Sequence, residues 1–213
     1  MTIQRIMGAS AALALLFAAT IAAAQAPTPP ASPAPPPTRV RGTIDSVDGS
    51  TLAVTSRDGS KVTVKLADNA PVVGIAKASL SDVKQGGFVG ITAMPEPDGT
   101  QKAVEIHIFP EAMRGTGEGH RPWDLMPNST MTNATVDSKV ASSDGQTLVL
   151  KYKDGQQTFI VPANVIVVTY VPATAADLKP GAKIMVAAGA KQPDGTVLAP
   201  RINVGLNGVT PPM

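Results

Sequence analysis

From residue 39 onward, apolar and polar residues alternate over short stretches of the chain. Val, Ile, Leu and Thr take every second position, and Asp-Gly or other glycine-rich pairs interrupt each stretch. A period of two predicts β-strands with one buried face, and Asp-Gly favours the positive φ that tight hairpins need. The pattern therefore predicts an all-β chain of short antiparallel strands joined by hairpins.

This pattern occurs twice. The recurring landmarks are Thr51-Leu52 with Thr147-Leu148, Asp58-Gly59 with Asp154-Gly155, Asp82 and Gly86 with Asp177 and Gly181, and Pro97-Asp98-Gly99-Thr100 with Pro193-Asp194-Gly195-Thr196. All are separated by 95 or 96 positions. A nearly constant spacing over four landmarks identifies an internal duplication.

Each copy holds six strand-like segments, and a flat sheet of that size would leave one face and two edges uncovered. Closure into a barrel removes the edges. A short polar segment in each copy, ASLSDVKQG and ATAADLKPG, is typical of a helical or 3₁₀ turn that plugs a barrel end. We predict two tandem, small OB-like barrels of five to six strands, with an SH3-like barrel or a small sandwich as alternatives.

The predicted organisation has six parts. They are a signal peptide at 1–24, a proline-rich disordered linker at 25–38, the first barrel module at 39–109, a bridge at 110–131, the second barrel module at 132–206 and a tail at 207–213.

The N-terminus has the pattern of an export signal. One basic residue, Arg5, precedes an apolar run over 6–23 that ends in Ala22-Ala23-Ala24. Small residues at that position suit signal peptidase, so we expect cleavage after Ala24 and a periplasmic or secreted protein. An uncleaved membrane anchor is the alternative. No later segment has the roughly 18–20 apolar residues of a transmembrane helix, so no membrane span is expected after cleavage.

Composition narrows the function. The chain has no cysteine, which excludes disulfides and thiolate chemistry. Its formal net charge is +2 and its aromatic content is 3%, too little for the basic groove and stacking rings of a nucleic-acid binder. It lacks a G-x-S-x-G elbow, an H-E-x-x-H pair and a phosphate-binding loop, and it has two histidines in all. We therefore predict that it is not an enzyme.

The bridge is the most varied part of the sequence. It holds the single tryptophan, Trp123, together with Arg114 and Arg121, which we regard as candidate ligand or interface residues. The simpler interpretation is that Trp123 and Leu125 pack between the barrels while the charged residues are solvated.

The same region offers metal ligands. The candidates are His107, Glu118, His120 and Asp124 for a divalent ion, with Glu105 as a further donor, and Met113, Met126 and Met131 for Cu(I). Their spacing matches no compact metal motif. The cofactor therefore stays unknown, with a divalent or copper ion as the candidate.

One resemblance follows from these motifs. A signal peptide, a proline-rich leader, the opening GTIDSVDGSTLAV, the plug SDVKQG and the hairpin PDGT are together similar to an exported bacterial domain family of unknown function. Residues 107–130 look like the signature of a duplicated alphaproteobacterial subgroup. The resemblance implies small OB-like barrels and carries a loose label of metal-transporter permease. A permease needs several membrane spans, which this sequence lacks.

We expect an exported, non-enzymatic binding or scaffold protein whose partner is an envelope protein, a glycan or a small ligand. The alternative is a metal-binding accessory protein for envelope metal handling. The oligomeric state is left open by the sequence.

Overall fold

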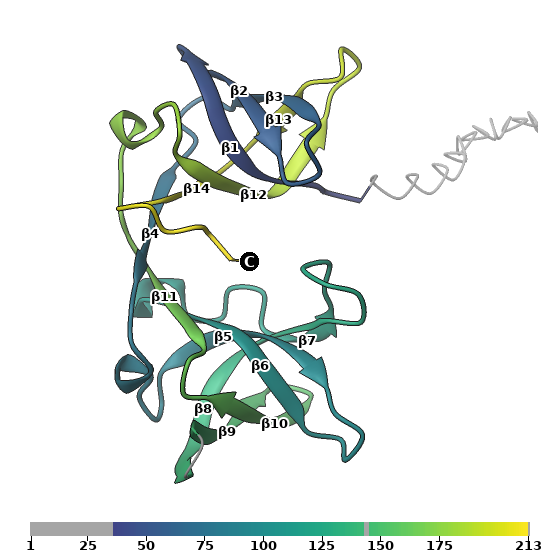
Figure 1. The fold of residues 1–213 in the computed structure, drawn as a ribbon, viewed down its shortest axis with the longest axis vertical. Coiled ribbons are helices and arrows are strands. Elements are labelled where there is room, and N and C mark those ends of the chain that lie inside the picture. Colours follow the sequence, from purple (N-terminus) through teal and green to yellow (C-terminus); the bar gives the residue numbers. More distant parts are fainter. Residues whose placement is uncertain (1–35, 143–144, 213) are drawn as a thin grey trace, which may run out of the picture. The chain divides into compact units, whose positions relative to one another are not determined.

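A computed structural model describes residues 36–142 and 145–212. The predicted signal peptide and most of the proline-rich linker fall on residues 1–35, outside this part. The described chain is all-β, as predicted, with fourteen strands and three 3₁₀ helices of three residues each (Figure 1). Within it, no helix has the length and apolar character needed to cross a membrane.

Ten of the strands form two closed rings of five. The first barrel joins β1 (Thr38–Asp48), β2 (Thr51–Ser56), β3 (Lys61–Leu66), β13 (Val197–Ala199) and β12 (Lys183–Lys191). Its ring closes because β12 pairs with β1 as well as with β13. The second joins β5 (Phe88–Pro95), β6 (Gln101–Ile108), β10 (Gly155–Pro162), β9 (Gly145–Tyr152) and β8 (Thr130–Ser142), and closes through β8 and β5.

The barrels do not coincide with the two copies of the repeat. The first barrel combines the first three strands of the first copy with the last strands of the second copy, and the second barrel does the reverse. The core of the first barrel thus packs Leu52 and Val64 against Ile184. That of the second packs Ile91 and Ile106 against Phe159 and its neighbours. In place of the expected tandem order, 39–109 then 132–206, the two copies are interleaved, and an OB-like assignment stays a prediction.

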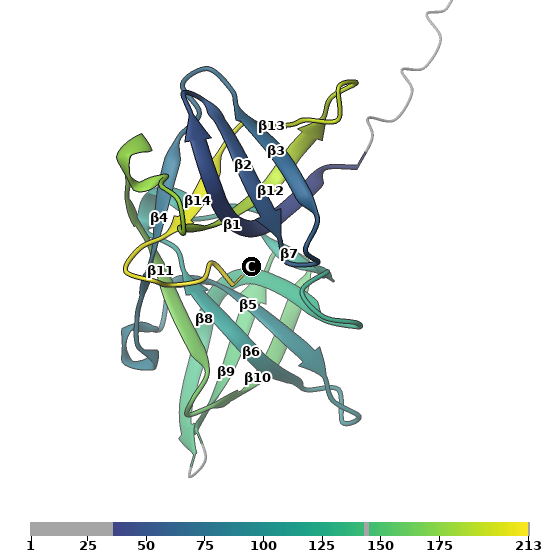
Figure 2. The same ribbon diagram turned by 45° about the horizontal axis from the view of Figure 1, so that its top comes forward.

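Three further strands connect the barrels. They are β4 (Val72–Lys77), β11 (Ile166–Pro172) and β14 (Ile202–Gly205). β4 pairs antiparallel with β11, β4 pairs parallel with β14, and β11 pairs parallel with β6. Ile75 lies opposite Tyr170, its own equivalent 95 positions later, so a local two-fold relation between the copies passes through this pair. Figures 1 and 2 show β4 and β11 side by side between the barrels.

The polar plug segments form 3₁₀ turns at η1 (Leu80–Asp82) and η3 (Ala175–Asp177). In each, the last carboxylate accepts a hydrogen bond from the backbone N–H three residues earlier, 2.9 Å for Asp82 and 2.8 Å for Asp177. This closes the turn as a capping box. The next residues, Val83 and Leu178, are buried in the second and first core respectively. The bridge contributes the third turn, η2 (Glu111–Met113), and β7 (Gly119–Pro122), which pairs with β8.

Candidate functional site

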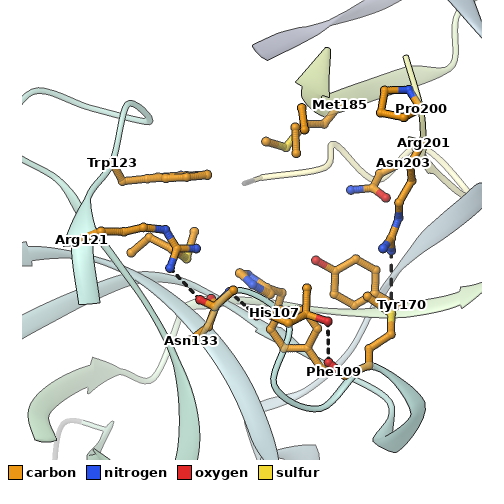
Figure 3. Close-up of a pocket in the computed structure, with 16 residues that line it drawn as sticks. His107, Phe109, Arg121, Trp123, Asn133, Tyr170, Met185, Pro200, Arg201 and Asn203 are labelled. Atoms are coloured by element: carbon orange, nitrogen blue, oxygen red, sulfur yellow. Dashed lines mark hydrogen bonds between the residues drawn. The ribbon is translucent and has the colours of Figure 1, made fainter. Parts of the chain in front are cut away.

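A cavity of about 210 Å³ lies where the linking strands, both barrels and the bridge meet. Figure 3 shows side chains converging on it from opposite sides. One side carries Arg121, Trp123 and Asn133, and the other carries Met185, Arg201 and Asn203. The remaining wall is aromatic and is formed by the end of β6 and by β11.

The aromatic wall consists of His107, Phe109 and Tyr170. The rings of Phe109 and Tyr170 are stacked with centroids 5.1 Å apart, and the imidazole meets Phe109 edge-on at 4.8 Å. Offset and edge-on contacts of this kind favour a rigid wall because they match the ring quadrupoles. Burial raises the pKa of the Tyr170 hydroxyl, and the nearby positive charge of Arg201 opposes that shift. The phenol therefore stays protonated at neutral pH.

His107 is held by a buried carboxylate. Its Nδ1 lies 2.8 Å from Glu105 Oε1, and Thr92 donates a hydrogen bond of 3.1 Å to Glu105 Oε2. All three side chains are almost fully buried. Both oxygens of the carboxylate are engaged, so Glu105 is held in place and orients the imidazole for its T-shaped contacts with Phe109 and Tyr170.

Gly90, on β5, leaves the space that this imidazole occupies. A Cβ at Gly90 would lie 1.9 Å from His107 Nε2 and 2.6 Å from Asn133 Oδ1. No residue larger than glycine fits there unless His107 moves. The absence of a side chain on one strand therefore positions a ring on its neighbour.

The bridge closes one side of the cavity. Asp124 accepts hydrogen bonds of 2.8 and 3.2 Å from Arg41 and lies 3.4 Å from Arg39, both on β1. The hydrogen bond from Arg41 lowers the pKa of the Asp124 carboxyl. Arg39 also lies over the Trp123 ring at 4.3 Å. These contacts hold the bridge, and with it the indole, against the first barrel.

Four buried polar atoms at this cavity have no hydrogen-bond partner in the described chain. They are Trp123 Nε1, Asn133 Oδ1, Arg201 Nε and Asn203 Oδ1. The only other such atom among the described residues is Gln146 Oε1, which does not line the cavity. Asn133 and Asn203 are 5% and 7% exposed. Buried polar groups are almost always paired, so a cluster of unpaired ones is typical of a site that receives an outside partner.

The predicted ligand and interface residues separate into two groups. Arg121 and Trp123 line the cavity. Arg114 does not: it binds Glu111 and donates a 2.9 Å hydrogen bond to the carbonyl oxygen of Gly86. This arginine therefore fixes the start of the bridge to the second barrel.

The four predicted metal ligands do not come together. His107 pairs with Glu105, Asp124 with Arg41, His120 Nδ1 lies 2.7 Å from Thr132 Oγ1, and a carboxylate oxygen of Glu118 accepts the backbone N–H of Lys153. Across residues 36–142 and 145–212, no group of three or more His, Asp and Glu side chains is placed to hold a metal ion. Met113 and Met131 line the cavity, together with Met185.

Several cavity residues were not singled out from the sequence, namely Asn133, Tyr170, Met185, Arg201 and Asn203. The repeat carries a signal for two of them. An offset of 96 pairs Arg201 with Glu105 and Asn203 with His107. Polar residues at two equivalent positions of a buried strand, beside apolar Ile202 and Ile106, mark a polar site next to a core.

The fold and the cavity define an all-β protein of two five-stranded barrels that share the two copies of one repeat. Comparison of the chain with protein-family models, with curated proteins and with solved structures found no match. The resemblance to an exported family of unknown function accordingly stays a prediction.

Proposed function

We propose that this chain is an exported, non-enzymatic protein that binds a small organic molecule in the cavity between its barrels. The observation that carries the proposal is that four residues lining one cavity each hold a buried polar atom without a partner, while aromatic and thioether side chains form much of the remaining lining. A largely apolar pocket with a few convergent polar groups is the common form of a small-molecule site. The export part rests on the pattern of residues 1–24.

The single tryptophan of the chain supplies the assay. Trp123 lines the cavity, so its fluorescence reports on occupancy without a label. Protein lacking residues 1–24 is titrated with a panel of one-ring carboxylates, amides, amines and alcohols, and the melting temperature is measured in parallel. We expect at least one compound to change the emission saturably and to raise the melting temperature, because a ligand stabilises the state that binds it.

Asn203→Leu tests the location, because it removes an unpaired amide oxygen while the side chain stays of roughly similar length. It should weaken binding by tenfold or more. Ile160→Ser is the matched control, since Ile160 is an exposed residue of the second barrel that does not line the cavity. If no compound up to 1 mM (roughly the weakest affinity of interest) shifts either signal, or if Asn203→Leu binds like the parent, the proposal is wrong.

A further inference from the structure

The charges around the cavity are unbalanced. Arg121 and Arg201 approach it from opposite sides (Figure 3). In the part of the chain that the structure describes, neither guanidinium is within ion-pair distance of a carboxylate. Arg121 donates to the carbonyl oxygen of Gly117 at 2.7 Å, and Arg201 donates to the thioether of Met113 at 3.7 Å. Neither contact neutralises a positive charge.

Two acidic groups near the cavity are already engaged. Asp124 is shared between Arg39 and Arg41, and Glu105 is bound by His107 and Thr92 behind the aromatic wall. Arg39, Arg41, Arg121 and Arg201 together carry four positive charges in this region, against the two negative charges of Asp124 and Glu105. Burial lowers the pKa of Arg121, and the charge of Arg39 adds to this effect. A partly buried cation without a counter-ion is unfavourable, so an anion bound here would gain from both arginines.

The size and walls of the cavity restrict the rest of the ligand. A cavity of about 150 Å³ with apolar walls is known to hold benzene, and this one measures about 210 Å³. Trp123 lies on one side, and the Phe109–Tyr170 stack forms the floor (Figure 3). Met113, Met131 and Met185 also line the cavity. Thioethers and ring faces contact aromatic ligands favourably.

We infer that the ligand is a small carboxylate with a single apolar ring, bound with its carboxylate between Arg121 and Arg201 and its ring against Trp123 and Tyr170. This rests on the proposed function of the cavity. Guanidinium and carboxylate match in charge and in the spacing of two parallel hydrogen bonds. Among the unpaired atoms, Trp123 Nε1 and Arg201 Nε are donors that suit a carboxylate, whereas the oxygens of Asn133 and Asn203 are acceptors and need a donor elsewhere on the ligand or on a water. The same arginines disfavour a cation, including copper held by the three methionine thioethers.

Benzoate, benzamide and acetate are the probes. Benzamide keeps the ring and the shape of benzoate but lacks its charge, whereas acetate keeps the charge but lacks the ring. Each is titrated into protein lacking residues 1–24 while Trp123 emission is recorded. Benzoate should bind at least tenfold more tightly than either of the others, and its affinity should fall as salt is raised, because screening weakens the contacts to exposed parts of the guanidinium groups.

Two variants test whether Arg121 and Arg201 bind the carboxylate of the ligand. Arg121→Gln and Arg201→Gln should each weaken benzoate binding tenfold or more, because each removes one charge-assisted contact. The affinity for benzamide should change less than about threefold. Arg57→Gln, in the exposed turn after β2, removes the same charge away from the cavity and should leave both affinities unchanged. Circular dichroism and melting temperature show whether each variant is folded.

The outcomes separate the two proposals. Equal binding of benzamide and benzoate by the parent protein overturns the carboxylate inference and leaves a cavity ligand standing. If acetate binds as tightly as benzoate, the inference that the ligand carries a ring is wrong. Binding of neither benzoate nor any other carboxylate of the panel, while an amine or alcohol binds, also overturns the inference. Failure of the whole panel contradicts the proposed function itself. Because the three probes are compared on the parent protein, the result does not depend on how the variants fold.

Discussion

The last strand of each repeat copy provides one wall of the cavity, and the two walls differ in an orderly way. The core-facing positions hold similar residues: Ala103 corresponds to Ala199 and Ile106 to Ile202, all buried. The positions on the other face of the two strands hold different residues. They are Glu105 against Arg201, His107 against Asn203 and Phe109 against Gly205.

This contrast shows that dense packing restricts the core-facing side of each strand, whereas the side that faces the cavity is free to vary. A closed barrel interior is densely packed, and changes in the size of a core residue are costly. The outward face of each of these two strands meets the cavity. If the two copies were identical, the local two-fold relation would place the same side chains on both walls. The differences on that face give one aromatic wall backed by a buried carboxylate and one wall with the Asn203 amide and the Arg201 guanidinium. Arg201 contacts Met113 and the Tyr170 ring but has no ion pair among the described residues. The two wall strands therefore have similar core-facing residues and different cavity-facing residues, which makes the cavity asymmetric.

Separation of the two copies is the change with the largest expected effect. If residues 36–109 and 110–213 are produced as two chains, neither should be a folded monomer, because each barrel takes strands from both copies. Mixed together, they should assemble. Dispersion of amide resonances and sedimentation measure this, and a folded monomer from 36–109 alone would favour contiguous barrels instead.

The two cores can be compared at equivalent positions. Phe159 and Val64 are fully buried, and each lies opposite the equivalent leucine, Leu148 and Leu52. Phe159→Ala should cost about 3–5 kcal/mol. Val64→Ala should cost clearly less, because it removes two methyl groups instead of a ring. Urea unfolding measures both. Because the barrels share both copies, each variant should shift one common transition, and two separate transitions would argue against this coupling.

Gly90 on β5 and Met185 on β12 are 95 positions apart and are therefore equivalent in the two copies. Only the β5 position requires glycine, because the His107 imidazole lies against it. Gly90→Ala places a Cβ on the His107 imidazole, and overpacking of this kind costs about 1–3 kcal/mol. In a His107→Ala background the same substitution should cost less, which a double-mutant cycle measures. An equal cost in both backgrounds would show that His107 does not set the requirement for glycine.

The smallest effect concerns the histidine of the bridge. Burial lowers the pKa of His120, and the charge of Arg121 adds to the shift. The folded pKa is therefore below the ordinary value of about 6.5, so the unfolded chain binds more protons as the pH falls. The stabilising contribution is present above pH 6.5 and is lost below it. The melting temperature of His120→Gln should fall less between pH 7.5 and 5 than that of the parent. His107 remains in both proteins, and parallel curves would contradict the assignment.

Local patterns in the sequence predicted a substantial part of this structure. Alternation and Asp-Gly turns indicated the strands and hairpins, and the polar plug segments form 3₁₀ turns at η1 and η3. Trp123 and Arg121, singled out for their unusual surroundings, line the cavity. The metal candidates were chosen by chemical type, and in the structure His107, Glu118, His120 and Asp124 are engaged at four different places. Spacing along the chain could not reveal this, because Asp124 meets Arg41 from a distant strand.

By itself, the sequence determined the all-β class, because the period of two and the turn residues act within a few positions. It also carries matching landmarks 95 or 96 positions apart. Only the tertiary structure decided that each barrel closes with strands from the other copy. The apolar faces of equivalent strands are alike, so the pattern along β3 suits β6 as well as β13. In the observed arrangement β4 and β11 pair between the barrels, and Arg201 and Asn203 lie across the cavity from Trp123 (Figure 3).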